Sequence, residues 1–246
     1  QILIRVKAAE ATKSDCELRS FNFPVKWFVL PLRIAMGITK PRRPILGGYF
    51  AGVVEQCGAE VTRFKTGDKI FGSTGLSMGA YGELMCLSEK ATLSKMPSNA
   101  SFEQAAAIPQ AAVLALQAVQ DKRPQKNALK VLINGAGGGA GSFAIQIAKS
   151  FGDEVTAVDS ESKFDLMRTL GADHLIDYTK EDFTQTGKTY DLIIDMMGYH
   201  SIFDYKRSLK KNGRYVMVGG CSSLIFQTLF IGSLFSLFTK NKLAIL

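Results

Sequence analysis

The chain has 246 residues, of which 46% are hydrophobic and 21% are charged. This composition suits a globular protein with a sizeable core and leaves little room for disorder. The net charge of +8 favours anionic partners such as phosphates, but it is not by itself a nucleic-acid signature, and we expect no nucleic-acid partner. Four cysteines form no C-x-x-C pair, and two histidines are too few for a three-histidine metal site.

The first hundred residues predict short β-strands separated by glycines, the pattern of a compact barrel. Residues 24–44 stay ambiguous because an apolar run is broken up by four prolines. The expected strands cover residues 2–6, 52–57, 69–72 and 81–87.

The pattern changes near residue 100, where Ser101 and Gln104 form a capping box in front of an alanine-rich helix. Pro109 is expected to break this helix, which resumes over 111–120. Strands and helices then alternate, which predicts a parallel, doubly wound sheet. The chain is therefore α/β, with one domain over 1–100 and a second over 101–246. The expected strands are 130–134, 154–158, 174–178, 190–196 and 214–218, and the expected helices are 143–150, 162–170 and 201–211.

The ends of the chain suggest a fragment. The sequence starts at Gln1 inside a strand pattern and stops on an apolar Leu-Ala-Ile-Leu run, so we expect both domains to be incomplete. The apolar residues 224–238 number fewer than the roughly 20 that a membrane span requires. They are expected to form a helix over a ligand cleft or at a dimer interface, and membrane contact is not expected.

A glycine-rich loop joins the strand at 130–134 to the helix that follows. Its order of strand, glycines and helix is that of a dinucleotide site, where the backbone approaches a pyrophosphate and the helix N-terminus offers free N–H groups. A tight turn that binds nothing is the alternative, but such a turn rarely needs five glycines. The loop runs Gly135, Ala136, Gly137, Gly138, Gly139, Ala140 and Gly141.

The next strand ends at Asp159, 18 residues after Gly141. An acidic residue there can accept hydrogen bonds from the adenosine ribose, which favours NADH. Ser160 and Lys163 follow closely, and a hydroxyl with a lysine could instead hold the 2′-phosphate of NADPH. These residues alone leave the coenzyme open.

Five phrases together resemble the medium-chain dehydrogenase/reductase superfamily, in its zinc-independent quinone oxidoreductase (ζ-crystallin-like) branch. The resemblance implies a GroES-like β-barrel domain followed by a Rossmann domain, with the active site in the cleft between them. It also implies a sixth Rossmann strand, whereas we expect this chain to stop after the fifth strand and an apolar helix. The phrases cover residues 45–54, 61–68, 79–83, 131–138 and 170–178.

The resemblance also implies roles for the cofactor-binding residues. Ala136, Gly138 and Gly141 match the A-x-G-x-x-G variant of this branch. Lys163 stands where the branch often places a lysine against the 2′-phosphate, and Tyr178 where it often places a tyrosine near the adenosine. NADPH is therefore favoured over NADH. Gly139, Ala140 and Gly219 complete the expected cofactor-binding set.

Zinc is not expected. The positions of two zinc ligands in the alcohol dehydrogenases of this superfamily are occupied by Thr12 and Gly48, which cannot replace a thiolate or an imidazole. Without a Lewis acid, alcohol oxidation is difficult. Hydride transfer to a quinone or an enone needs only orientation and a donor for the developing oxyanion. Tyr49 is the first candidate donor, Tyr81 the second, and Thr12 and Ser14 are further candidate hydroxyls.

The sequence therefore predicts a cytoplasmic NAD(P)H-dependent oxidoreductase acting on a quinone or an α,β-unsaturated carbonyl, and the resemblance implies a homodimer. Two alternatives stay open. One is a non-catalytic NAD(P)H-binding protein of the same fold, which the loss of a polar group at Gly48 keeps open. The other is a membrane-associated reductase that uses residues 224–238.

Overall fold

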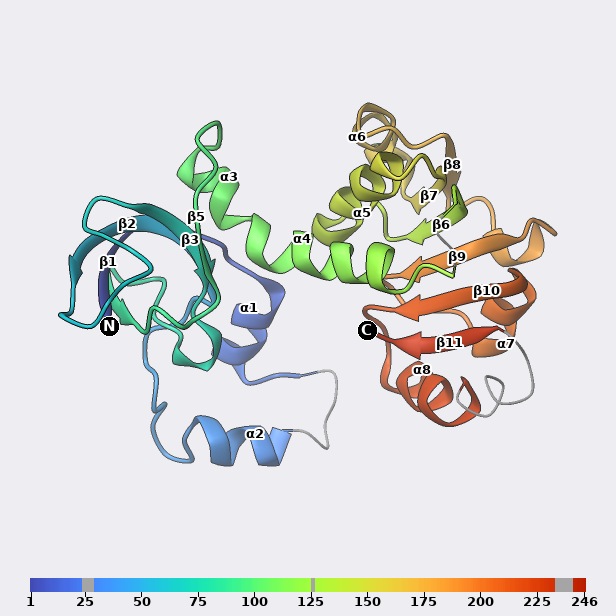
Figure 1. Ribbon diagram of the computed structural model, residues 1–246. Helices are drawn as coiled ribbons and strands as arrows, with labels where there is room; N and C mark the ends of the chain where they lie inside the picture. The colour runs from blue at the N-terminus through green and yellow to red at the C-terminus, as the bar shows by residue number, and fades with distance from the viewer. Residues whose placement is uncertain (24–28, 125–126, 233–240) are drawn as a thin grey trace. The chain divides into compact units, whose positions relative to one another are not determined.

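The computed structural model describes residues 1–23, 29–124, 127–232 and 241–246. The chain divides into two compact units, Gln1–Gln110 and Ala111–Leu246. Each unit has its own sheet and its own buried core, and Figure 1 shows the elements of both.

The N-terminal unit contains a five-stranded antiparallel sheet in the order β4-β1-β2-β3-β5. The four expected strands form, but β4 starts three residues later than the sequence predicts. Gly79 has φ +103°, and the Gly82 N–H donates to its carbonyl, so residues 79–82 make a turn instead. The short β5 is not foreseen. The strands are β1 (Ile2–Ala9), β2 (Tyr49–Cys57), β3 (Lys69–Ser73), β4 (Leu84–Leu87) and β5 (Leu93–Lys95).

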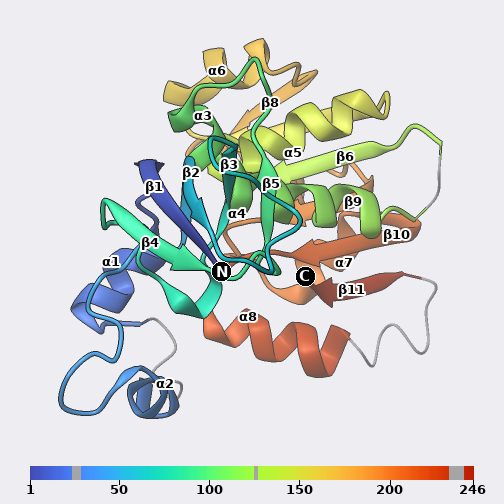
Figure 2. The same cartoon turned by 60° about the vertical axis from the view of Figure 1, so that its left-hand side comes forward.

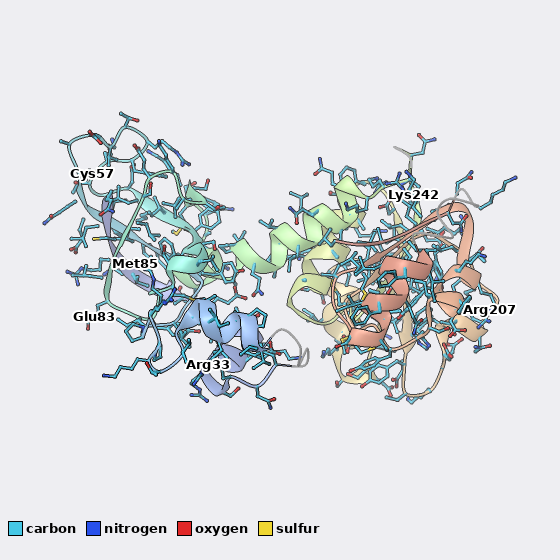
Figure 3. The ribbon with its side chains drawn as sticks, turned by 90° about the horizontal axis from the view of Figure 1, so that it is seen from below. Arg33, Cys57, Glu83, Met85, Arg207 and Lys242 are labelled. Carbon is cyan, nitrogen blue, oxygen red and sulfur yellow. The ribbon has the colours of Figure 1, made fainter. Side chains whose placement is uncertain are left out.

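Side-chain alternation places the apolar residues of these strands on one buried face, where Ile2, Ile4, Phe50 and Ile70 are fully enclosed. In the view of Figure 3, Cys57 on β2 and Arg33 on α2 lie at opposite ends of this unit. The helices are α1 (Lys13–Ser20), α2 (Val29–Met36), the 3₁₀ turn η2 (Gly75–Ser77), α3 (Phe102–Ala106) and α4 (Ile108–Leu116), which spans the division between the units.

The predicted capping box at Ser101 forms: its hydroxyl accepts the Gln104 N–H, and the Gln104 side chain accepts the Ser101 N–H. The helix break lies at Ala107, two residues before the expected break at Pro109, and α4 begins at Ile108. Pro109 therefore stands in the first turn of α4, where its missing N–H costs nothing, and the resumption expected at 111 is wrong by three residues.

The C-terminal unit contains a six-stranded parallel sheet in the order β11-β10-β9-β6-β7-β8. After β6 the chain adds β7 and β8 on one side of it, and then returns to add β9, β10 and β11 on the other side. The strand order therefore switches between β6 and β9, and ligands bind at such a switch in parallel sheets. The strands are β6 (Lys130–Asn134), β7 (Glu154–Asp159), β8 (His174–Asp177), β9 (Tyr190–Asp195), β10 (Leu209–Met217) and β11 (Lys242–Ile245). The helices are η3 (Gln117–Asp121), α5 (Gly139–Ser150), η4 (Glu161–Lys163), α6 (Phe164–Thr169), η5 (Phe183–Gln185), α7 (Ile202–Arg207), α8 (Ser222–Phe226) and η6 (Gln227–Gly232).

Two expectations about this sheet are wrong. The chain does not stop after the fifth strand, because β11 pairs in parallel with β10 and buries Leu243 against the core. The helix expected over 201–211 ends at Arg207. Strand β10 starts at Leu209, which pairs with Tyr190 at the start of β9. Asn212, at φ +69°, lies where the β9–β10 register shifts, so the lysine-rich stretch is an irregular strand rather than a helix end.

The apolar residues 224–238 are only partly covered by the described chain, because 233–238 lie outside it. The described part forms α8 and η6, which lie along the edge strand β11 (Figures 1 and 2). Leu224 and Thr228 face the core, whereas Phe230 is 70% exposed. Among the described helices, none combines the length and the hydropathy that crossing a bilayer would require.

Candidate functional site

The glycine loop lies between β6 and α5, at the switch in strand order. Gly135 has φ +83°, and its N–H and that of Ala136 both donate to the Val158 carbonyl, which fixes the loop to β7. Gly138 caps α5 without a side chain. The N–H groups of the first helical turn have no intrahelical acceptor, and the helix dipole makes this end positive. The arrangement suits an anion such as a pyrophosphate.

The glycines of the loop serve different purposes. A Cβ on Gly141 would lie 2.3 Å from the Gly135 carbonyl oxygen, so the helix packs against the loop only with glycine there. A Cβ on Gly137 would lie 2.4 Å from Cδ of Lys163. At Gly138 and Gly139 the nearest atoms would be 3.4 and 3.7 Å away, so these two positions are open.

A cavity of about 650 Å³ opens beside the loop, within the size range of small-molecule sites. Six of the predicted cofactor-binding residues line it: Gly135, Gly138, Asp159, Ser160, Lys163 and Tyr178. The rest of its lining consists of Asn134, Val158, Glu181, Asp182, Phe183, Met197, Tyr199 and His200, which the sequence does not single out.

The other five predicted residues lie close by but outside that lining. Ala136 is a fully buried residue of the loop, while Gly139, Ala140 and Gly141 form the first turn of α5. Gly219 follows β10, and a Cβ there would lie 2.6 Å from the Met196 carbonyl oxygen. The open loop, the helix N-terminus and the cation and hydroxyl of the cavity lining fit the phosphate groups of a dinucleotide.

Asp159 ends β7 and holds the loop. Its carboxylate accepts the N–H groups of Gly137 at 2.9 Å and Ser160 at 2.8 Å, and it forms an ion pair with Lys163 at 3.1 Å. The Lys163 side chain stays 43% exposed, and Lys163 and Ser160 both line the cavity. The rim therefore carries a cation and a hydroxyl, and the carboxylate beside them already accepts three bonds from the protein.

A buried polar network lies behind this cavity. Asp195, at the end of β9, is fully enclosed and accepts hydrogen bonds from the Asn134 amide at 2.9 Å and the Tyr215 hydroxyl at 2.8 Å. It also accepts the N–H groups of Met197 and Gly198, so it holds the loop that borders the cavity. The sequence signal was available: both Asn134 and Asp195 end apolar parallel strands, whose carboxyl ends meet at one edge.

The three predicted catalytic residues come together in the N-terminal unit, with Glu10 and Asp15. The Thr12 hydroxyl donates to Asp15 at 2.6 Å and caps α1, and the Tyr81 hydroxyl donates to the Glu10 carbonyl at 3.3 Å. Tyr49 pairs through its carbonyl with the Glu10 N–H. We call these five residues the tyrosine cluster.

The environment of the cluster keeps its tyrosines protonated. Burial, a hydrogen bond with Asp15 and nearby negative charge raise the pKa of Tyr81 to about 12. Burial, with Glu10 and Asp15, also raises the pKa of Tyr49. Both phenols are therefore neutral O–H donors at physiological pH, which is what stabilising a developing oxyanion requires.

Glu10 carries an unused acceptor. Its Oε2 is buried and has no hydrogen-bond partner among the described residues. Burial and the charge of Asp15 raise the pKa of this carboxyl. No motif marks Glu10 in the sequence, because its environment comes from segments far apart in the chain. Gly48, next to Tyr49, leaves open space where a Cβ would lie. Within the described part of the chain, no group of three His, Cys, Asp or Glu side chains could hold a metal ion.

Comparison with known proteins agrees with both halves of the fold. Residues 1–117 match the alcohol dehydrogenase GroES-like domain, and residues 139–242 match the zinc-binding dehydrogenase domain. The predicted fold class, a GroES-like domain followed by a Rossmann domain, is confirmed. The structure is similar to that of the quinone oxidoreductase from Coxiella burnetii, with a TM-score of 0.79 and 28% identity over 100% of this chain and 73% of that one.

Two curated plant enzymes are also similar. The 2-methylene-furan-3-one reductase of Solanum lycopersicum is 33% identical over 80% of this chain and 50% of its own length. The chloroplastic NADPH-dependent alkenal/one oxidoreductase of Arabidopsis thaliana is 31% identical over 89% of this chain and 55% of its own length. The chain thus spans about half the length of the curated relatives it matches.

Proposed function

Because the chain belongs to the medium-chain dehydrogenase/reductase superfamily and resembles its zinc-independent quinone oxidoreductases, we propose that it is an NAD(P)H-dependent reductase of a quinone or an α,β-unsaturated carbonyl. The observation that carries the proposal is the open glycine loop beside a cavity of about 650 Å³. The coenzyme, when bound, supplies the hydride. The residues of the chain bind it, orient the substrate and stabilise charge.

NADPH is the coenzyme we propose. The first turn of α5 would bind the pyrophosphate, and Lys163 and Ser160 would bind the 2′-phosphate, with Tyr178 beside the adenosine. The engagement of Asp159 by the loop and by Lys163 supports this choice, because its carboxylate is less available to a ribose hydroxyl. We further propose a homodimer, located in the cytoplasm or in an organelle; the Arabidopsis relative is named as chloroplastic.

Tyr49 is the group we propose as the hydrogen-bond donor to the substrate oxygen, with Tyr81 as the second candidate. Charge builds on that oxygen as the hydride arrives, and a neutral phenol stabilises it. Burial and the charges of Glu10 and Asp15 raise the pKa of Tyr49, so its phenol stays protonated at physiological pH. Thr12, whose hydroxyl is committed to Asp15, would hold the cluster in shape.

A coenzyme titration tests the binding half of the proposal. Lys163→Ala is expected to weaken NADPH binding about 10- to 100-fold, the range for a hydrogen bond to a charged group, and to leave NADH binding unchanged. Lys188→Ala, an exposed lysine outside the cavity lining, is the control. Asp159→Ala should weaken both coenzymes, because it releases the loop. Equal NADPH affinity in wild type and Lys163→Ala would show that the coenzyme assignment is wrong.

Turnover with a panel of quinones and enals tests the catalytic half. Tyr49→Phe is expected to lower kcat about 10- to 100-fold while NADPH binding stays unchanged. The open space at Gly48 supports one competing function, a non-catalytic NAD(P)H-binding protein. Tight NADPH binding by the full-length protein without turnover of any panel member would select that function instead.

A further inference from the structure

One segment of the N-terminal unit has a charge of a single sign. Between Glu17 and Glu55 the sequence contains no Asp or Glu, while it contains six cations. Such a run gives this segment of the chain a positive charge at neutral pH. The cations are Arg19, Lys26, Arg33, Lys40, Arg42 and Arg43.

The same segment exposes large aliphatic side chains. Leu30 and Ile34 lie one turn apart on α2 and are 69% and 53% exposed. Ile38, just beyond the helix, is 65% exposed, and Ile45 is 50% exposed. Single exposed apolar residues are ordinary, whereas four within 16 residues give this segment an unusual share of exposed aliphatic side chains.

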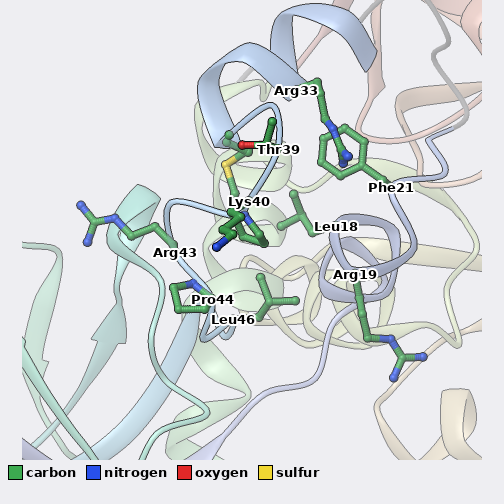
Figure 4. A pocket seen from close by; sticks show the side chains of 12 residues that line it. Leu18, Arg19, Phe21, Arg33, Thr39, Lys40, Arg43, Pro44 and Leu46 are labelled. Carbon is green, nitrogen blue, oxygen red and sulfur yellow. The ribbon is translucent and has the colours of Figure 1, made fainter.

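A small cavity of about 230 Å³ lies in the same segment, between Leu18 and Leu46, and four cations contribute to its lining (Figure 4). Arg33 stacks over the Phe21 ring at 4.5 Å, while Arg19 and Arg43 extend away from the cavity. Leu18 and Leu46 supply apolar walls. Among the described residues, no carboxylate lies within ion-pair distance of any of the four cations: Arg19, Arg33, Lys40 and Arg43.

We propose that this surface, which we call the basic apolar face (the described residues of 18–46), binds the surface of a bilayer that contains anionic phospholipid. The aliphatic side chains would enter the boundary between headgroups and acyl chains, and the cations would contact the phosphates. Charge complementarity selects this occupant. A second copy of the chain would bring cations against cations, and a nucleic acid would leave the aliphatic side chains in water.

The test is flotation of the full-length protein with phosphatidylcholine vesicles, either pure or containing about a third phosphatidylserine. Binding is expected only to the anionic vesicles and is expected to weaken as salt increases. The triple variant Lys40→Glu, Arg42→Glu and Arg43→Glu should bind at least about a hundredfold more weakly, at roughly fivefold per cation. The control triple carries the same charge change on exposed lysines elsewhere in the unit: Lys7→Glu, Lys65→Glu and Lys90→Glu.

A second pair of variants tests the apolar contribution. Ile34→Asn should weaken vesicle binding, whereas Leu76→Asn, which replaces an 85% exposed leucine outside the face, should not. The proposal is overturned if anionic vesicles fail to float the wild type, or if the two triple variants bind equally. It is also overturned if Ile34→Asn leaves vesicle binding intact but dissociates an oligomer in light scattering, because the face would then join copies of the chain. None of these measurements depends on coenzyme or turnover.

Discussion

Gly141→Ala should separate the packing role of the glycine loop from its binding role. The added Cβ would lie 2.3 Å from the Gly135 carbonyl oxygen and 2.7 Å from two backbone atoms of Ala136. Because all three are backbone atoms, no side chain can move aside to relieve the overlap, and the loop or α5 must shift. Overpacking of this kind costs about 1–3 kcal/mol, of which the better helix propensity of alanine returns about 1 kcal/mol. The net loss is therefore up to about 2 kcal/mol.

Gly139→Ala is the matched control, two residues earlier in the same helix. Its Cβ would meet only Ala111, at an ordinary 3.7 Å, so the helix gains up to about 1 kcal/mol and nothing is displaced. The propensity gain is common to both variants, so thermal unfolding without coenzyme should separate them by the steric cost alone. That cost corresponds to roughly 2–12 °C, with Gly141→Ala lower. Equal melting temperatures would refute the argument that Gly141 is required for packing.

Two further predictions concern buried carboxylates. Asp195→Ala leaves two side-chain donors and two backbone N–H groups without their acceptor. Denaturant unfolding of the C-terminal unit should show a loss of about 3–5 kcal/mol in the free energy of unfolding, and a smaller loss for Asp195→Asn. A loss under about 1 kcal/mol for Asp195→Ala would contradict the network. Glu10 has a raised pKa from burial and from Asp15, so its contribution to stability is complete below its unfolded pKa of about 4.3 and is lost as pH rises through the folded value. The Glu10→Gln side chain cannot ionise. The melting temperature of this variant should therefore rise relative to that of the wild type as the pH is raised from about 4 to about 7. A difference in melting temperature that does not change with pH would contradict the raised pKa of Glu10.

Several features are predictable from the sequence because the responsible forces act within a few residues. The Ser101 capping box, the strand at Lys130–Asn134 and the glycine loop all follow from local hydrogen bonding, side-chain periodicity and backbone freedom. The cavity beside the loop follows from the same pattern, because parallel strands end at one edge.

Other features depend on which distant segments meet. Lys242–Ile245 resembles an apolar tail, and it becomes a strand because β10 offers a free edge and the core accepts Leu243. The helix expected up to Lys211 is cut short because Leu209 pairs with Tyr190 instead. Both errors come from long-range strand pairing, which overrides local preference.

The sequence by itself determined the two-part fold and the placement of the glycine loop, since both follow from residue type and spacing. Only the tertiary structure gathered Glu10, Asp15 and Tyr81 into one cluster and enclosed Asp195 behind the cavity. The physical reason is that burial and electrostatic coupling arise between residues far apart in the chain. A side chain's pKa and its free hydrogen-bonding capacity therefore belong to the fold.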